Sequence, residues 1–266
     1  LDITGANLSA GVTFASTISS GDEIKATAAH VTGKTIAGAG VLTISGTASD
    51  TNFSALTAAV VDVTAATLNG TSNFGSAIAE GDEFRFTAAQ VTGKTIGGAG
   101  TKTITKLNAD LDADLSNISS GTITAAFEDD GTFTGDLGSA TVTVTDSKTM
   151  TAGYSVLNGK TINHDGSESG QALVIQITES DKAGDVGNVS GNIAKSISFT
   201  ESQTFTGNVQ SLTSTIENSV TVTAAADEFD AKTVNGAGQL TLTGTGTGGT
   251  DLSNISADIL DITGAD

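Results

Sequence analysis

The sequence predicts an all-β fold, a parallel β-solenoid (β-helix) built from short rungs. Three observations lead to this prediction: a composition dominated by Thr, Ser, Gly and Ala, short runs of alternating apolar and polar residues, and internal repetition. The alternative is a row of tandem β-sandwich domains, each of which needs about 100 residues. In that case, the repeat described below would be half of one domain.

The composition favours strands joined by tight turns. Thr is β-branched and fits an extended backbone, whereas Gly supplies the positive φ angles that turns need. The 266 residues include 33 Gly and ten Phe, but no Trp, Cys or Pro. Because a wide globular core uses more bulky side chains, we expect a narrow bore filled by small apolar residues. Without Cys, the chain must be held together by burial and backbone pairing alone.

Period-two alternation marks the strands, because successive side chains of a strand point to opposite faces. The alternating segments are 41–45, 141–145, 173–177 and 239–243. Thr-x-Thr pairs recur about every 20 residues, at 103/105, 122/124 and 141/143 and again at 204/206, 221/223 and 241/243. A solenoid rung of three short strands needs about that length. No long segment shows helical spacing.

Internal repeats organise the chain. Residues 1–60 align without gaps on residues 61–120 and are identical at 25 of the 60 positions. The centre reads TAAHVTGKTIAGAG in the first copy and TAAQVTGKTIGGAG in the second. Two weaker copies follow, and the Lys that marks each copy stands at 34, 94, 160 and 232. The predicted subrepeats are therefore 1–60, 61–120, 121–185 and 186–259.

The two ends of the sequence share one hexapeptide. LDITGA occupies residues 1–6 and returns at residues 260–265. We expect a larger repeat of 259 residues, about thirteen rungs, that continues beyond both ends, with 260–266 as the start of the next unit. The alternative is a common short rung motif that falls at both ends.

The charge of the chain excludes some partners and admits others. With 30 acidic and 11 basic residues the formal net charge is −19, which disfavours nucleic acid because phosphate binding needs clustered Lys and Arg. No run of about 18 apolar residues is present, so we expect no direct membrane insertion. An acidic surface repels its neighbours or holds divalent cations.

Calcium is the only cofactor that the sequence suggests, because hard cations bind converging carboxylate oxygens. Three acidic pairs and one alternating triplet are the candidate ligands: Asp22, Glu23, Asp82, Glu83, Asp227, Glu228, Asp110, Asp112 and Asp114. On a strand, the three residues of the triplet would share one face. A further cluster is Glu128, Asp129 and Asp130. The alternative is solvated charge that protects strand edges from pairing.

The residues needed for catalysis are scarce, so we expect no enzyme. His30 aligns with Gln90 in the second copy, and His164 stands in a turn sequence. The Gly-Lys-Thr triplets lack the first Gly of a phosphate-binding loop. They are expected to supply a turn Gly, a solvated Lys and a strand-opening Thr. An enzyme of the polysaccharide-lyase type would need a basic groove, and Arg85 is the only Arg in the chain.

The repeated segments GDEFRFTAAQVTGKTI and DLSNIS, together with the Thr-rich strands, give the chain a distinctive style. In these features it resembles giant repetitive bacterial surface proteins: adhesins, S-layer-like proteins and extracellular filament subunits. The resemblance implies an extracellular or cell-surface location and a structural role in a filament, sheath, surface layer or adhesin stalk. Its partners would be further copies of itself. The alternatives are a calcium- or glycan-dependent adhesion module and an ice-binding solenoid that presents Thr ladders.

Overall fold

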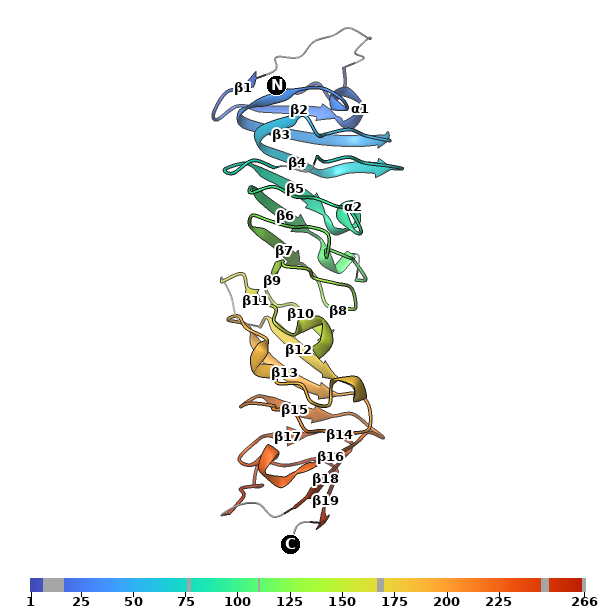
Figure 1. Cartoon of the computed structure of the whole chain (residues 1–266), viewed down its shortest axis with the longest axis vertical. Helices are drawn as coiled ribbons and strands as arrows, with labels where there is room; N and C mark the ends of the chain where they lie inside the picture. The colour runs from blue at the N-terminus through green and yellow to red at the C-terminus, as the bar shows by residue number, and fades with distance from the viewer. Residues whose placement is uncertain (7–16, 76–77, 110, 167–169, 245–248, 265–266) are drawn as a thin grey trace. The chain divides into compact units, whose positions relative to one another are not determined.

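The computed structural model describes residues 1–6, 17–75, 78–109, 111–166, 170–244 and 249–264. They form a β-solenoid of about 12 turns, nearly all parallel β-sheet (Figure 1). The chain divides into two compact units, and each is described by itself. Unit 1 comprises Leu1–Phe127 and Gly135–Thr141, and unit 2 comprises Glu128–Thr134 and Val142–Asp266.

Unit 1 contains seven strands and three single-turn helices. The strands are β1 (Thr17–Ile18), β2 (Glu23–Thr27), β3 (Ile36–Ser49), β4 (Leu56–Asn69), β5 (Glu83–Thr87), β6 (Thr101–Thr105) and β7 (Ile123–Phe127). The helices are α1 (Ala28–Val31), α2 (Ala88–Val91) and the 3-10 turn η1 (Leu107–Ala109). Figure 1 shows β2 to β7 stacked in the order of the chain.

The remaining strands are β8 (Gly131–Phe133), β9 (Thr141–Val144), β10 (Thr149–Gly153), β11 (Ile162–His164), β12 (Ala172–Ile177), β13 (Ala194–Phe199), β14 (Gln203–Thr204), β15 (Thr213–Ile216), β16 (Thr221–Ala225), β17 (Val234–Asn235), β18 (Gln239–Thr243) and β19 (Ile259–Gly264). The helical turns of unit 2 are α3 (Tyr154–Leu157), η2 (Glu179–Asp181), η3 (Val186–Asn188) and η4 (Ala226–Phe229).

Every strand pair among the described residues is parallel. The solenoid prediction is therefore confirmed. The sandwich alternative is wrong, because such domains are made of antiparallel strands joined by short connections. The predicted alternation is also confirmed, since Leu42, Ile44, Leu240 and Leu242 are fully buried.

The core is a set of ladders in which each turn places one side chain above the last. In unit 1 the ladder that starts at β2 runs through Ile24, Leu42, Val61, Phe84, Lys102 and Ile123, in steps of 18 to 23 residues. In unit 2 a second ladder runs through Phe133, Ala152, Ile175, Ile197, Ser214 and Val234. Several steps exceed 20 residues, which is why about 12 turns are formed where about thirteen were expected.

Two expectations about local structure are wrong. Strands β3 and β4 each extend over 14 residues, longer than the predicted runs, because shifts of register let each of them continue around a bend. The bore also holds large rings as well as small side chains. Nine Phe are buried, and Phe74, Phe84 and Phe86 pack with ring centroids 5.0 to 6.2 Å apart. The tenth, Phe14, lies outside the described residues.

Candidate functional site

The acidic pair Asp22/Glu23 lies where the chain enters β2, on the outer surface of unit 1. Glu23 is the first residue of the strand, and its Oε1 accepts a hydrogen bond of 2.6 Å from Thr43 Oγ1 on the next turn. Its Oε2 lies 3.6 Å from Lys25 Nζ. The Thr43 hydroxyl, followed by Lys25, lowers the pKa of Glu23. We call Glu23, Lys25 and Thr43 the first clasp, because they join consecutive turns.

The second copy of the repeat builds the same arrangement from Glu83, Arg85 and Thr103, the second clasp. Arg85 donates from Nε and from a terminal nitrogen to the two carboxylate oxygens of Glu83, each at 2.9 Å. Thr103 Oγ1 donates to Glu83 Oε1 at 2.7 Å. The Arg85 guanidinium lowers the pKa of Glu83, whereas burial raises the pKa of the adjacent Asp82. In both copies the glutamate is already bound by donors from the chain itself.

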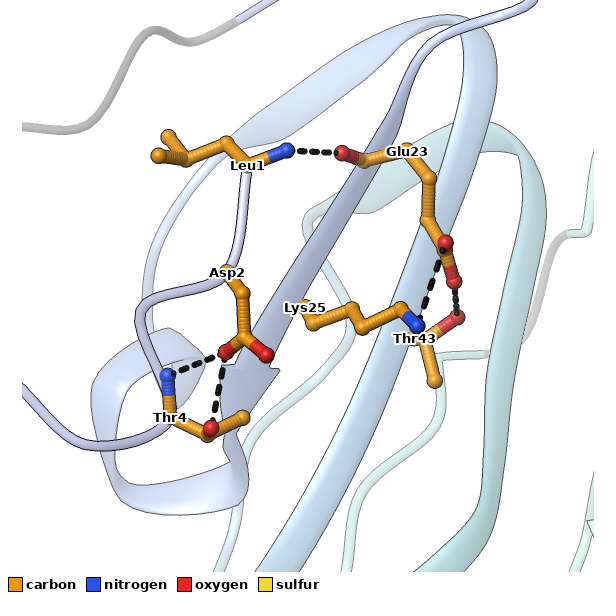
Figure 2. A network of polar contacts seen from close by, with 6 residues as sticks. All are labelled: Leu1, Asp2, Thr4, Glu23, Lys25 and Thr43. Carbon is orange, nitrogen blue, oxygen red and sulfur yellow. Dashed lines mark hydrogen bonds and ion pairs between the residues drawn. The ribbon is translucent and has the colours of Figure 1, made fainter.

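The N-terminal residues lie against β2 as one further short strand (Figure 2). The amino group of Leu1 donates to Glu23 O at 2.7 Å, and the amide of Lys25 donates to Leu1 O at 2.8 Å. Asp2 bridges Lys25 in parallel and accepts from the amide and hydroxyl of Thr4, at 2.9 and 2.7 Å. These bonds to Thr4 lower the pKa of Asp2.

A pocket of about 550 Å³ opens beside this N-terminal strand. Its walls come from Leu1–Asp2, from the end of β1 and from the first half of β2. Asp22, Glu23 and Lys25 supply its charges, while Thr17 and Ser19 supply hydroxyl groups. The pocket is therefore polar and of a size suited to a small hydrophilic group.

The remaining predicted calcium ligands do not share a face. Asp110 lies outside the described residues. Asp112 is in a turn and Asp114 forms an isolated bridge with Asp136, so the strand that was expected to align the triplet is not formed. Asp227 and Glu228 lie in the helical turn η4.

The third acidic cluster is also bound by the chain. Lys148 Nζ lies 2.8 Å from Asp129 Oδ1, and the Thr149 amide donates to Asp130 Oδ1 at 2.7 Å. Across the residues that the structure describes, no three His, Cys, Asp or Glu side chains come together as a metal site. Calcium binding stays a prediction.

The Gly-Lys-Thr triplets form corners of the solenoid. Gly33, Gly93 and Gly159 have φ angles of 68°, 65° and 74°, and Ala231 takes the same place in the fourth copy with a φ of 52°. In each copy a helical turn precedes the corner: α1, α2, α3 and η4 begin six residues before the marker Lys. The triplets are thus turns, as expected, and the helical turn is a recurring feature that the periodicity did not reveal.

The helical turns also explain His30. In α1 the amide of Thr27 donates to His30 Nδ1 at 3.5 Å and Thr27 Oγ1 accepts from the His30 amide at 3.3 Å. In α2 the Thr87 amide donates to Gln90 Oε1 at 2.9 Å. The imidazole and the amide both cap a helix, which is why one replaces the other. The signal in the sequence was Thr followed by His or Gln three residues later.

The repeated DLSNIS segment locks one turn onto the turn before it. Asp114 Oδ1 accepts from the Ser116 amide, and Asp251 Oδ1 accepts from the Ser253 amide, both at 2.9 Å. These serines lower the pKa of each aspartate. The amide of Asp114 in turn donates to Thr92 Oγ1 at 2.8 Å on the previous turn. The motif is therefore a structural corner.

Lys102 is a core residue that sequence reasoning missed. The alternation of β6 directs it inward beside Ile104, and its side chain is fully buried. Its Nζ donates to four backbone carbonyls, those of Gly98, Gly100, Ser119 and Ser120. Burial lowers the pKa of this ammonium group. The signal was present in the sequence, because Lys102 aligns with the core residue Leu42.

Each helix that the structure describes is too short and too polar to span a lipid bilayer. Comparison of the chain with protein-family models, with curated proteins and with solved structures finds no match. The geometry therefore has to carry any statement about function by itself.

Proposed function

We propose that this chain is a structural repeat segment of an extracellular bacterial filament, sheath, surface layer or adhesin stalk, and that it acts by self-assembly. It is not proposed to be an enzyme. The observation that carries the proposal is the uniformly parallel stacking of the described strands, which gives each turn contacts mainly with its neighbours. Such a stack leaves an open strand edge wherever it stops, and an open edge pairs readily with another chain.

The polar contacts on the surface support the same role. The two clasps, the DLSNIS corners and the pairing of Lys148 with Asp129 each tie one turn to the next. Side chains that could coordinate a ligand are used to stiffen the stack. The net charge of −19 keeps lateral surfaces apart, which favours contacts at the edges over sideways aggregation.

Electron microscopy and sedimentation velocity of the purified chain, over a series of concentrations and ionic strengths, test the proposal. We expect species that grow with concentration and that show axial order in the images. A chain that remains a compact monomer at every concentration, with no axial order, would contradict a self-assembling role.

The pocket beside β2 favours one alternative, a calcium- or glycan-dependent adhesion module. Its volume of about 550 Å³ and its mixture of carboxylates and hydroxyls suit a sugar or a hydrated cation. Thermal unfolding in calcium chloride and in EDTA tests the calcium form, because a ligand that binds only the folded state raises the Tm. Equal Tm values in the two solutions would remove calcium, and a glycan array would test the sugar form.

A further inference from the structure

The large apolar side chains that remain exposed are confined to one repeated sequence. Among the described residues they are Leu1, Leu260 and Ile262, with 75%, 40% and 50% of their surface exposed. All three belong to the LDIT segments at residues 1–4 and 260–263. Each segment forms a strand at the edge of its own unit, the first on β2 and the second on β18.

At the first edge the segment is in register with the core of unit 1. Asp2 lies opposite Lys25, and the amides of Lys25 and Ile3 pair with Leu1 O and Lys25 O at 2.8 and 2.9 Å. This register places Leu1 opposite Ile24. Leu1 therefore stands at the head of the core ladder that continues to Leu42.

At the second edge the same segment is in register with the core of unit 2. Leu260 lies opposite Leu240 and Asp261 opposite Thr241. Leu240 in turn lies opposite Val222, and both of these side chains are fully buried. Leu260 is therefore the last member of a core ladder, left exposed because no further turn covers it.

We propose that two copies of this chain join by strand exchange, in which Leu260–Thr263 of one copy takes the place of Leu1–Thr4 on β2 of the other. This inference rests on the proposed self-assembly. The sequence that β2 accepts and the sequence that β18 presents are identical, so the exchanged strand keeps the same backbone bonds. The joined core ladder reads Leu240, Leu260, Ile24 and is apolar throughout.

The charges distinguish this joint from simple addition of one edge to the other. Exchange places Asp261 opposite Lys25, an opposite-charge pair on the outer face. Addition in register would place Asp261 opposite Asp2, and like charges directly opposite each other are unfavourable. Exchange also covers Leu260 and Ile262 with the turn formed by β2, which supplies the apolar burial that drives association.

Charge reversal tests the joint, with sedimentation velocity over a concentration series at low salt as the measurement. Asp261→Lys places a lysine opposite Lys25, and Lys25→Asp places an aspartate opposite Asp261. We expect each variant alone to associate roughly tenfold more weakly than the natural chain. Asp258→Lys, at an exposed residue just before β19, is the matched control with the same change of charge and should associate normally.

Mixing the two variants gives the decisive result. In a mixture, the lysine introduced by Asp261→Lys faces the aspartate introduced by Lys25→Asp, and the natural pair forms at the opposite joint. Association should therefore return to the level of the natural chain. Far-UV circular dichroism verifies that each variant is folded. Rescue in the mixture cannot arise from a folding defect, because neither variant alone would supply it.

Each other outcome overturns a defined part of the reasoning. If Asp261→Lys associates as well as the natural chain, or more tightly because the introduced lysine now faces Asp2, strand exchange is wrong while self-assembly stands. If the natural chain itself never associates, the proposed function fails together with the joint.

Discussion

Lys102 and Leu42 occupy the same position in two copies of the repeat, and exchanging them tests why a lysine is accepted in the core. In the second copy, Gly98 and Gly100 lie in a bend outside the strands, and their carbonyls accept from Lys102 Nζ. In the first copy the matching bend belongs to β3, where Gly38 pairs with Ala58 of β4. Backbone amides thus do in one copy what the ammonium group does in the other.

The two substitutions should therefore differ in cost. Leu42→Lys buries a charge among carbonyls that are already paired, and an uncompensated buried charge costs about 3–5 kcal/mol. Lys102→Leu leaves the buried bond from Lys102 to Gly100 O unmade, which costs about 1–3 kcal/mol, but it also removes the desolvation cost of the ammonium. We expect Leu42→Lys to be more destabilising by at least about 2 kcal/mol.

Urea unfolding followed by far-UV circular dichroism at pH 7 measures the difference. A second series at rising pH adds a check of sign. Because burial lowers the pKa of Lys102 below its ordinary value of 10.5, the unfolded chain binds more protons than the folded one just below that pH. The natural chain should then gain stability relative to Lys102→Leu as the pH rises toward 10.5. Equal losses for the two substitutions at pH 7 would refute the carbonyl explanation.

Three further substitutions probe the clasps, the corners and the core. Glu83→Gln should cost less than about 1 kcal/mol at pH 7, and the loss should vanish in acid. The reason is that Arg85 lowers the pKa of Glu83 below its ordinary 4.5, so the pair contributes fully above that pH and is lost as the pH falls through the lower folded-state value; acid titration of unfolding measures this. Gly38→Ala should lower the Tm far more than Gly33→Ala, because a Cβ at Gly38 would overlap the backbone of β1 while the space around Gly33 is open. Phe86→Ala should cost about 3–5 kcal/mol in urea unfolding, since Phe86 is fully buried between two other rings; a loss below about 1 kcal/mol would contradict this packing.

Much of the fold could be predicted because the solenoid repeats a local rule. Each strand alternates, so Leu42, Ile44, Leu240 and Leu242 could be assigned to the core without knowing what they contact. Each Gly-Lys-Thr corner needs a positive φ, and Gly marks that position in three copies out of four. A duplication of 25 identities in 60 positions then identified the turn as the unit of structure.

The candidate site was less predictable, because its chemistry depends on neighbours about 20 residues away. Glu23 and Glu83 were proposed as calcium ligands from their position beside Asp22 and Asp82. In the structure, Thr43 and Thr103 donate to these glutamates from the next turn. Which outward side chains face each other across turns depends on register, and a shift of one residue would change every pair.

The sequence by itself determined the parallel repeat, the inward and outward faces of its strands and the positions of its turns, because these follow from local periodicity and from the φ angles that Gly permits. Only the tertiary structure decided that a lysine completes the core of the second copy and that serine and threonine hydroxyls bind the acidic residues. It also decided that the LDIT segments end two core ladders. These outcomes depend on the register between turns, which is set by packing across the stack.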